Sequence, residues 1–205
     1  MKDVKDMGEP NVNIAALIGS RICHDLISPI GAINNGLELL EMSGAREGPE
    51  MALISESCAD ATARIRFFRV AFGAAPEGRD IGSGELRDII APLVRPGRHR
   101  IDWRPEEPLS RAEAQIGFLA LLCAESALPR GGEIVIDRVA DRWVVRASGD
   151  DISTECRGWL AMEHPGMAAD LPPARVQFLL LPQVAAALGR QVEVRRDDTW
   201  LELKI

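Results

Sequence analysis

The chain has 205 residues and a formal net charge of −7, with 46% hydrophobic and 27% charged residues. This balance is typical of a globular protein with a sizeable core, and the acidic charge argues against nucleic acid as a partner, because binding to a phosphate backbone depends on an excess of Lys and Arg. Residues 1–10 contain no apolar signal region, and the longest apolar run, residues 116–124, is too short to cross a bilayer. We therefore expect a cytoplasmic protein with no membrane partner.

A long amphipathic helix is predicted to begin after a cap at Asn11 or Asn13 and to end near Met42. Its apolar residues recur at spacings of three and four, so they share one face that should be buried. These residues are Ile18, Ile22, Leu26, Ile30, Ile33, Leu37 and Leu40.

His24 lies away from the apolar face of this helix. At about 100° per residue it is roughly 170° from the centre of that face, so its ring should point to solvent. The residues closest to it at helical neighbour spacings are Arg21, Ser28, Gly31 and Asn35. A lone exposed histidine is most often an ordinary surface residue, but here Asp25 follows it and Pro29 stands inside the same helix. Because an interior proline costs about 3 kcal/mol, we expect the bend to have a use.

A second amphipathic helix is predicted from Pro49 to Gly73, with apolar residues at alternating spacings of four and three. Two helices joined by a short loop fold back as an antiparallel hairpin, but a lone hairpin cannot cover two wide apolar stripes. We expect two copies of the chain to form a four-helix bundle across a two-fold axis, with His24 on the outside of each half. The alternative is that the hairpin packs only on the rest of its own chain.

A change of composition to Gly, Ala, Pro and charged residues near 74–84 predicts a linker between two units, residues 1–77 and 78–205. In the second unit the patterns predict both helices and strands. Helices are expected at 84–93, 111–128, 154–160 and 172–188, and strands at 99–103, 133–139, 142–147, 191–196 and 200–205. The strands should form an antiparallel sheet with helices on one face, so the fold class is α+β.

The sequence His-Asp-Leu-Ile-Ser-Pro at residues 24–29 resembles the phospho-acceptor motif of dimeric two-component histidine kinases. The longer run at 20–38 is similar to that of the ChpT-like family of bacterial histidine phosphotransferases, whose members pass phosphate between receiver domains. The resemblance implies an N-terminal helical hairpin that forms a dimeric four-helix bundle, residues 1–77. A histidine-kinase-ATPase-like α/β sandwich would follow it, residues 78–205.

The resemblance also implies a function and a site. His24 would take phosphate from the receiver domain of a hybrid histidine kinase and pass it to aspartates of response regulators. Asp25 would hold the proton of the other ring nitrogen, and a receiver domain would pack over neighbouring residues. Those partner-binding residues are Arg21, Ser28, Gly31 and Asn35. Two alternatives stay open: a non-catalytic dimeric scaffold or regulator that binds receiver domains, and an active sensor histidine kinase.

The second unit resembles the ATP-binding domain of histidine kinases but lacks three of its nucleotide-binding features. Ala124 stands where the family places an asparagine that binds Mg, and Ala147 stands where a carboxylate reads adenine. The glycine-rich phosphate loop is replaced by residues 174–178, whose side chains prevent close approach of a phosphate. We interpret Gly131-Gly132 as a turn. The chain should therefore bind no ATP or other cofactor, and Mg should come with the partner receiver domain.

The remaining chemistry-bearing residues give weaker signals. The four cysteines, Cys23, Cys58, Cys123 and Cys156, are widely spaced, and we interpret them as reduced core residues. His99 and His164 have no second ligand at metal spacing, so surface or turn roles are expected and no metal site is predicted.

Overall fold

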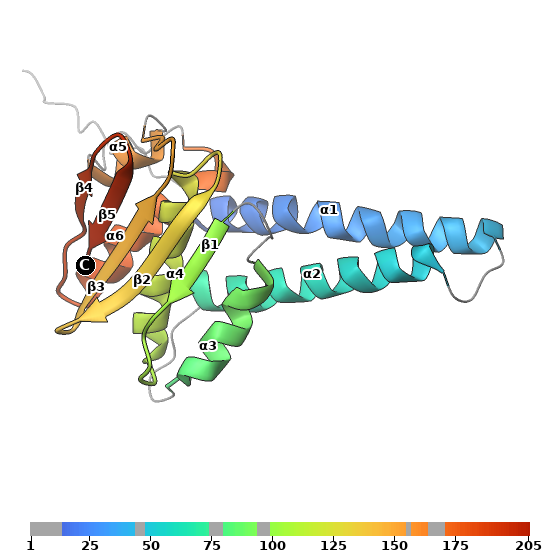
Figure 1. Cartoon of the computed structure of the whole chain (residues 1–205), viewed down its shortest axis with the longest axis horizontal. Helices are drawn as coiled ribbons and strands as arrows, with labels where there is room; N and C mark the ends of the chain where they lie inside the picture. The colour runs from blue at the N-terminus through green and yellow to red at the C-terminus, as the bar shows by residue number, and fades with distance from the viewer. Residues whose placement is uncertain (1–13, 44–47, 74–79, 94–98, 155–156, 164–170) are drawn as a thin grey trace, which may run out of the picture.

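The computed structural model describes residues 14–43, 48–73, 80–93, 99–154, 157–163 and 171–205. Two long antiparallel helices, α1 (Ile14–Ser43) and α2 (Pro49–Ala71), project from a body in which helices cover one face of a sheet (Figure 1). The two helix ranges agree with the predicted ones to within a few residues. The proposed cap at Asn11 or Asn13 and the predicted boundary near residue 78 lie outside the described residues.

Close packing between α1 and α2 depends on a glycine. A Cβ added at Gly36 would come within 2.5 Å of the Cγ1 atom of Ile54 and within 3.4 Å of the Glu50 carbonyl oxygen. The absence of a side chain therefore lets the two helices approach each other there. Pro29 of α1 is also buried, although it interrupts the hydrogen-bond ladder of the helix.

The apolar face predicted for α1 is only partly covered within one chain. Ile30 and Leu37 remain 49% and 48% exposed, and Ile65 of α2 is 47% exposed. Cys23 and Cys58 are exposed as well, so their interpretation as core residues is wrong; Cys123 is buried as expected, and Cys156 lies outside the described residues. The physical reason is that each helix of a two-helix hairpin touches its partner along a single strip.

The sheet of the body has five strands in the order β1-β2-β3-β5-β4. Their bounds are β1 (His99–Trp103), β2 (Gly132–Val139), β3 (Arg142–Ser148), β4 (Glu193–Arg196) and β5 (Trp200–Lys204). The prediction of an antiparallel sheet is wrong for one pair, because β1 pairs with β2 in parallel. A helix connects these two strands, so the chain re-enters the sheet in the same direction.

The helical segments of the body complete the mixed α/β architecture that the sequence predicted. They are α3 (Ser83–Ile90), the 3-10 turn η1 (Ala91–Leu93), α4 (Arg111–Ser126), α5 (Arg157–Glu163), the 3-10 turn η3 (Pro173–Arg175) and α6 (Gln177–Ala187). Ala140 and Asp141 both have positive φ, 50° and 63°, which makes the tight turn between β2 and β3. Within the described residues, no helix combines the length and the apolar character needed to cross a bilayer.

The base of the hairpin belongs to the core of the body. Phe67, near the end of α2, is 2% exposed and stacks on Phe118 of α4, with ring centroids 4.8 Å apart. Phe118 in turn meets Trp103 of β1 edge to face at 5.6 Å. Aromatic contacts of this kind contribute about 1 kcal/mol each beyond the area they bury. The hairpin is therefore anchored through its C-terminal end.

The Glu113 carboxylate, at the start of α4, is hydrogen-bonded to Trp143 of β3 and to Arg190, which follows α6. Both oxygens of Glu113 accept hydrogen bonds from Arg190, at 2.7 and 3.0 Å, and Oε2 also accepts one from Trp143 Nε1 at 2.8 Å. Burial alone would raise the pKa of Glu113, but the hydrogen bonds from Arg190 and Trp143 outweigh it and lower the pKa below its ordinary value. The ionised form is therefore the one that the fold stabilises.

We expect Glu113→Gln to lower the free energy of unfolding at neutral pH by about 2 kcal/mol, because hydrogen bonds to a charged group are lost. The lowered pKa means that this stabilisation is complete above the unfolded-state value of about 4.3 and is lost as the pH falls through the folded-state value. Urea unfolding at pH 7 and pH 4 should show the difference between wild type and variant shrinking at the lower pH. Glu107→Gln, at an exposed position, is the control, and an equal loss in both variants would contradict the assignment.

Candidate functional site

His24 lies on the exposed side of α1, as its helical position predicted. Its side chain is 78% exposed, and its Nδ1 atom lies 3.0 Å from Oδ1 of Asp25. Because an ionised carboxylate can only accept a hydrogen bond, this contact places the proton of the neutral ring on Nδ1. The other nitrogen, Nε2, then keeps a lone pair that can act as a nucleophile or a base.

Asp25 is held on its other side by Arg21. The Nε atom of Arg21 donates to Oδ2 of Asp25 at 2.6 Å, and its Nη1 atom donates to the carbonyl oxygen of Ala174 in η3. The two side chains are only 15% and 14% exposed, in contrast to the imidazole beside them. The exposed ring is therefore connected to the body through two largely buried charged groups.

The other residues predicted near His24 follow it along α1. Ser28 and Asn35 are exposed and Gly31 is half-buried. A Cβ added at Gly31 would meet nothing within 4 Å, so no contact inside the chain requires a glycine there. This differs from Gly36, which lies on the face that packs against α2.

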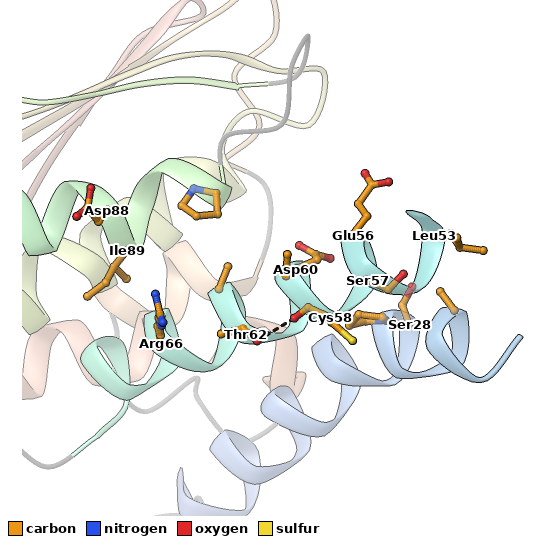
Figure 2. A pocket seen from close by; sticks show the side chains of 15 residues that line it. Ser28, Leu53, Glu56, Ser57, Cys58, Asp60, Thr62, Arg66, Asp88 and Ile89 are labelled. Carbon is orange, nitrogen blue, oxygen red and sulfur yellow. Dashed lines mark hydrogen bonds between the residues drawn. The ribbon is translucent and has the colours of Figure 1, made fainter. Parts of the chain in front are cut away.

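A groove beside this face has a volume of about 960 Å³ and was not expected from the sequence. Figure 2 shows Ser28 of α1 at one side, Asp88 and Ile89 of α3 at the other, and residues of α2 between them. Of the charged residues that line it, Glu56, Asp60 and Asp88 are acidic and Arg66 is basic. The periodicity of α3 indicates a helix, but its packing against α2 depends on tertiary contacts that local patterns do not specify.

A smaller cavity of about 270 Å³ lies between the hairpin and the body, behind Arg21 and Asp25. His99 lines it and is 8% exposed, so the expected surface role of His99 is wrong. Its Nε2 atom lies 3.0 Å from the Leu128 carbonyl oxygen, and its Nδ1 atom lies 3.7 Å from Glu125 Oε1. His99 is buried because β1 begins beneath the C-terminal end of α4. Across the described ranges, no three His, Cys, Asp or Glu side chains are grouped to hold a metal ion.

The segments that the resemblance aligns with nucleotide-binding features lie as follows in this structure. Ala124 and Ala147 are fully buried in the core of the body. Gly131, with a φ of 91°, donates to the Leu128 carbonyl oxygen and closes a turn, which confirms the interpretation for this residue. Gly132, with a φ of 149°, is instead the first residue of β2. Ala174, in the segment that the resemblance aligns with the phosphate loop, accepts the hydrogen bond from Arg21.

Known proteins resemble this chain in sequence and in structure. Residues 83–199 match the family model of the histidine phosphotransferase C-terminal domain. Protein phosphotransferase ChpT of Brucella abortus (strain 2308) is 42% identical over 127 residues, which cover 61% of this chain and 60% of that protein. A bacterial phosphotransferase of known structure superposes with a TM-score of 0.77 at 31% identity, covering 97% of this chain and 100% of that one. The chain thus aligns with somewhat less than two thirds of the curated relative.

Proposed function

The chain belongs to the ChpT-like histidine phosphotransferase family, and we propose that it carries phosphoryl groups on His24 between receiver domains of a multistep two-component phosphorelay. The donor is the receiver domain of a hybrid histidine kinase, and the acceptors are aspartates of response regulators. The observation that supports this most directly is the pairing of a 78% exposed imidazole with a carboxylate at Nδ1. This arrangement leaves Nε2 free for a partner.

In the first step, the Nε2 lone pair attacks the phosphorus atom of the donor's aspartyl phosphate. A P–N bond forms and the P–O bond to the aspartate breaks, so the donor leaves with a free carboxylate. In the second step, a carboxylate of the acceptor attacks the same phosphorus, and the electron pair of the P–N bond returns to Nε2. Asp25 keeps the proton on Nδ1 throughout and stabilises the positive charge that the ring acquires.

The chain needs no cofactor of its own for this exchange. Mg²⁺ bound to the receiver domain would offset the charge of the phosphoryl oxygens. The receiver domain would dock over Ser28, Gly31 and Asn35 and extend into the groove between α1 and α3. A partner that enters this groove would meet more acidic than basic side chains, so we expect basic groups on its surface there.

We also propose that the protein works as a homodimer in the cytoplasm. Large apolar side chains stay exposed along both helices of the hairpin, and a second hairpin would cover them. They include Ile27, Ile30, Leu37, Met51 and Ile65. The resulting four-helix bundle would leave His24 accessible, because His24 lies on a different side of α1 from Ile30.

The direct experiment is to incubate the protein with a receiver domain that has been phosphorylated on its aspartate. Label should move to the chain in an acid-labile, alkali-stable form, as a phosphoramidate does, and should leave when an unphosphorylated response regulator is added. A protein that binds receiver domains but takes no label would be a non-catalytic scaffold, and the proposal would fail.

Mg-ATP should neither bind the body with micromolar affinity nor label His24 when no other protein is present. The physical reason is that Ala124 and Ala147 offer no oxygen ligand and that side chains occupy the segment replacing the phosphate loop. Isothermal calorimetry and incubation with γ-labelled ATP are the measurements. A micromolar dissociation constant, or label on His24 from ATP alone, would restore the sensor-kinase alternative.

Substitutions at Gly31 test the docking surface. We expect Gly31→Ala to fold and to retain transfer, because the added methyl meets open space and alanine favours a helix by about 1 kcal/mol over glycine. Gly31→Arg should also fold, but its bulk should raise the receiver concentration needed for half-maximal transfer at least tenfold. Circular dichroism and transfer titrations measure the two effects. Transfer by Gly31→Arg at the normal receiver concentration would place docking elsewhere.

A further inference from the structure

We propose that Arg21 is a positioning residue for His24 and that the body holds Arg21 in place through the Ala174 carbonyl. This inference rests on the proposed phosphotransfer function and specifies how its nucleophile is oriented. It assigns Arg21 a role inside the chain, in place of the partner contact expected from the sequence. The segment that replaces the phosphate loop then serves as an anchor for the phospho-acceptor.

The contacts form one continuous series from η3 to the imidazole. The Ala174 carbonyl oxygen accepts from Nη1 of Arg21, Arg21 Nε donates to Oδ2 of Asp25, and Oδ1 of Asp25 faces Nδ1 of His24. Each oxygen of the carboxylate thus has its own partner. Rotation of the carboxylate about its Cβ–Cγ bond would break both contacts together, so the position of Oδ1 depends on Arg21.

An arginine can make these contacts because its guanidinium is a planar group with several N–H donors in fixed directions. Nε serves the carboxylate on the same helix while Nη1 reaches a residue 153 positions away in the sequence. A lysine ammonium carries the same charge but lacks this rigid fork. Arg21→Lys therefore keeps the positive charge and removes the geometry of the guanidinium, so it tests which of the two orients Asp25.

The ordinary alternative is an ion pair of the kind that forms between residues four apart on many helices. Such pairs contribute little to stability and fix no geometry. Arg64 and Asp60 of α2 form one, with a distance of 3.2 Å and side-chain exposures of 21% and 33%. The Arg21–Asp25 pair is shorter and more buried, and both of its residues line the cavity at the junction of hairpin and body, whereas only Arg64 of the other pair does. It is also the pair that touches the reacting ring.

The experiment combines transfer kinetics with ¹⁵N NMR of the His24 ring in wild type, Arg21→Gln and Arg21→Lys. Wild type should show mainly the tautomer with its proton on Nδ1. In Arg21→Gln the proton should shift toward Nε2, and the transfer rate at saturating phosphorylated receiver should fall about tenfold or more, as misplaced groups do. The receiver concentration for half-maximal rate should change little. Arg21→Lys should resemble Arg21→Gln. Arg146→Lys, which alters an ion pair of similar length with Glu202 on the sheet, is the control and should resemble wild type.

The results for the variants separate the positioning role of Arg21 from the phosphotransfer function. A wild-type tautomer and rate in Arg21→Gln would overturn the positioning role while leaving the phosphotransfer function intact. Full recovery in Arg21→Lys would show that charge suffices and that the contact with η3 is incidental. If wild type itself takes no phosphate, the function fails, and the tautomer measurement still tests whether Arg21 orients the ring. Should Arg21→Gln not fold by circular dichroism, Arg21→Lys gives the decision alone.

Discussion

Replacing His24 with alanine is expected to abolish acceptance of phosphate while leaving the protein folded. The imidazole is 78% exposed, and removing an exposed side chain usually changes stability by no more than about 0.5 kcal/mol. No other described histidine shares its surroundings, because His99 is buried beneath α4. The measurement is the transfer of labelled phosphate from a receiver domain, together with the melting temperature.

Glu38→Ala, at an exposed position further along the same helix, is the control for His24→Ala. It should retain both label and melting temperature. Label that persists on His24→Ala would show that a different residue accepts the phosphate. A large drop in its melting temperature would show instead that the ring has a structural role.

Replacing Ile65 with aspartate should convert a dimer into a monomer. Ile65 is 47% exposed in one chain, and we expect the partner hairpin to bury the rest of it. An aspartate there would leave a buried charge without a partner, at a cost of about 3 kcal/mol or more. Light scattering should give about twice the chain mass of 22.4 kDa for wild type and a value near the chain mass for the variant.

Val139→Asp is the matched control, since Val139 is 56% exposed and lies at the β2–β3 turn, on the body. The same charge there should leave the mass unchanged. A wild-type protein that scatters as a monomer would refute the four-helix bundle. So would an Ile65→Asp variant that keeps the mass of a dimer, because position 65 would then lie outside the interface.

Much of the fold could be predicted because its signals are local. The spacing of apolar residues gave the two long helices, and the helical rotation of His24 relative to Ile22 and Leu26 gave its exposure. The alternation of apolar and polar residues predicted both strands of the β2–β3 hairpin. The short gap between them indicated a tight turn, which the positive φ angles of Ala140 and Asp141 confirm.

The features that could not be predicted depend on pairings between distant segments. The residue pattern of a short strand such as β1 does not show whether its neighbour runs parallel or antiparallel, so the parallel pairing of β1 with β2 had no local signal. His99 is buried against Leu128 and Glu125 at the end of α4, and no local pattern brings these residues to the start of β1. The contact between Arg21 and Ala174 joins residues 153 positions apart, and neither residue type indicates the other. For the same reason the groove beside Ser28 was not foreseen.

The aromatic stack at the base of the hairpin limits how this protein can be recombined with its relatives. Phe67 lies before residue 77, yet it fills space beside Phe118 in the other half of the chain. A chimera joined near residue 78 would place an unfamiliar side chain against Phe118, leaving either a void or a clash. Exchange of the helical hairpin between relatives would therefore require transplanting the α2 end and its contact surface on α4 together, so these two segments should vary together among relatives.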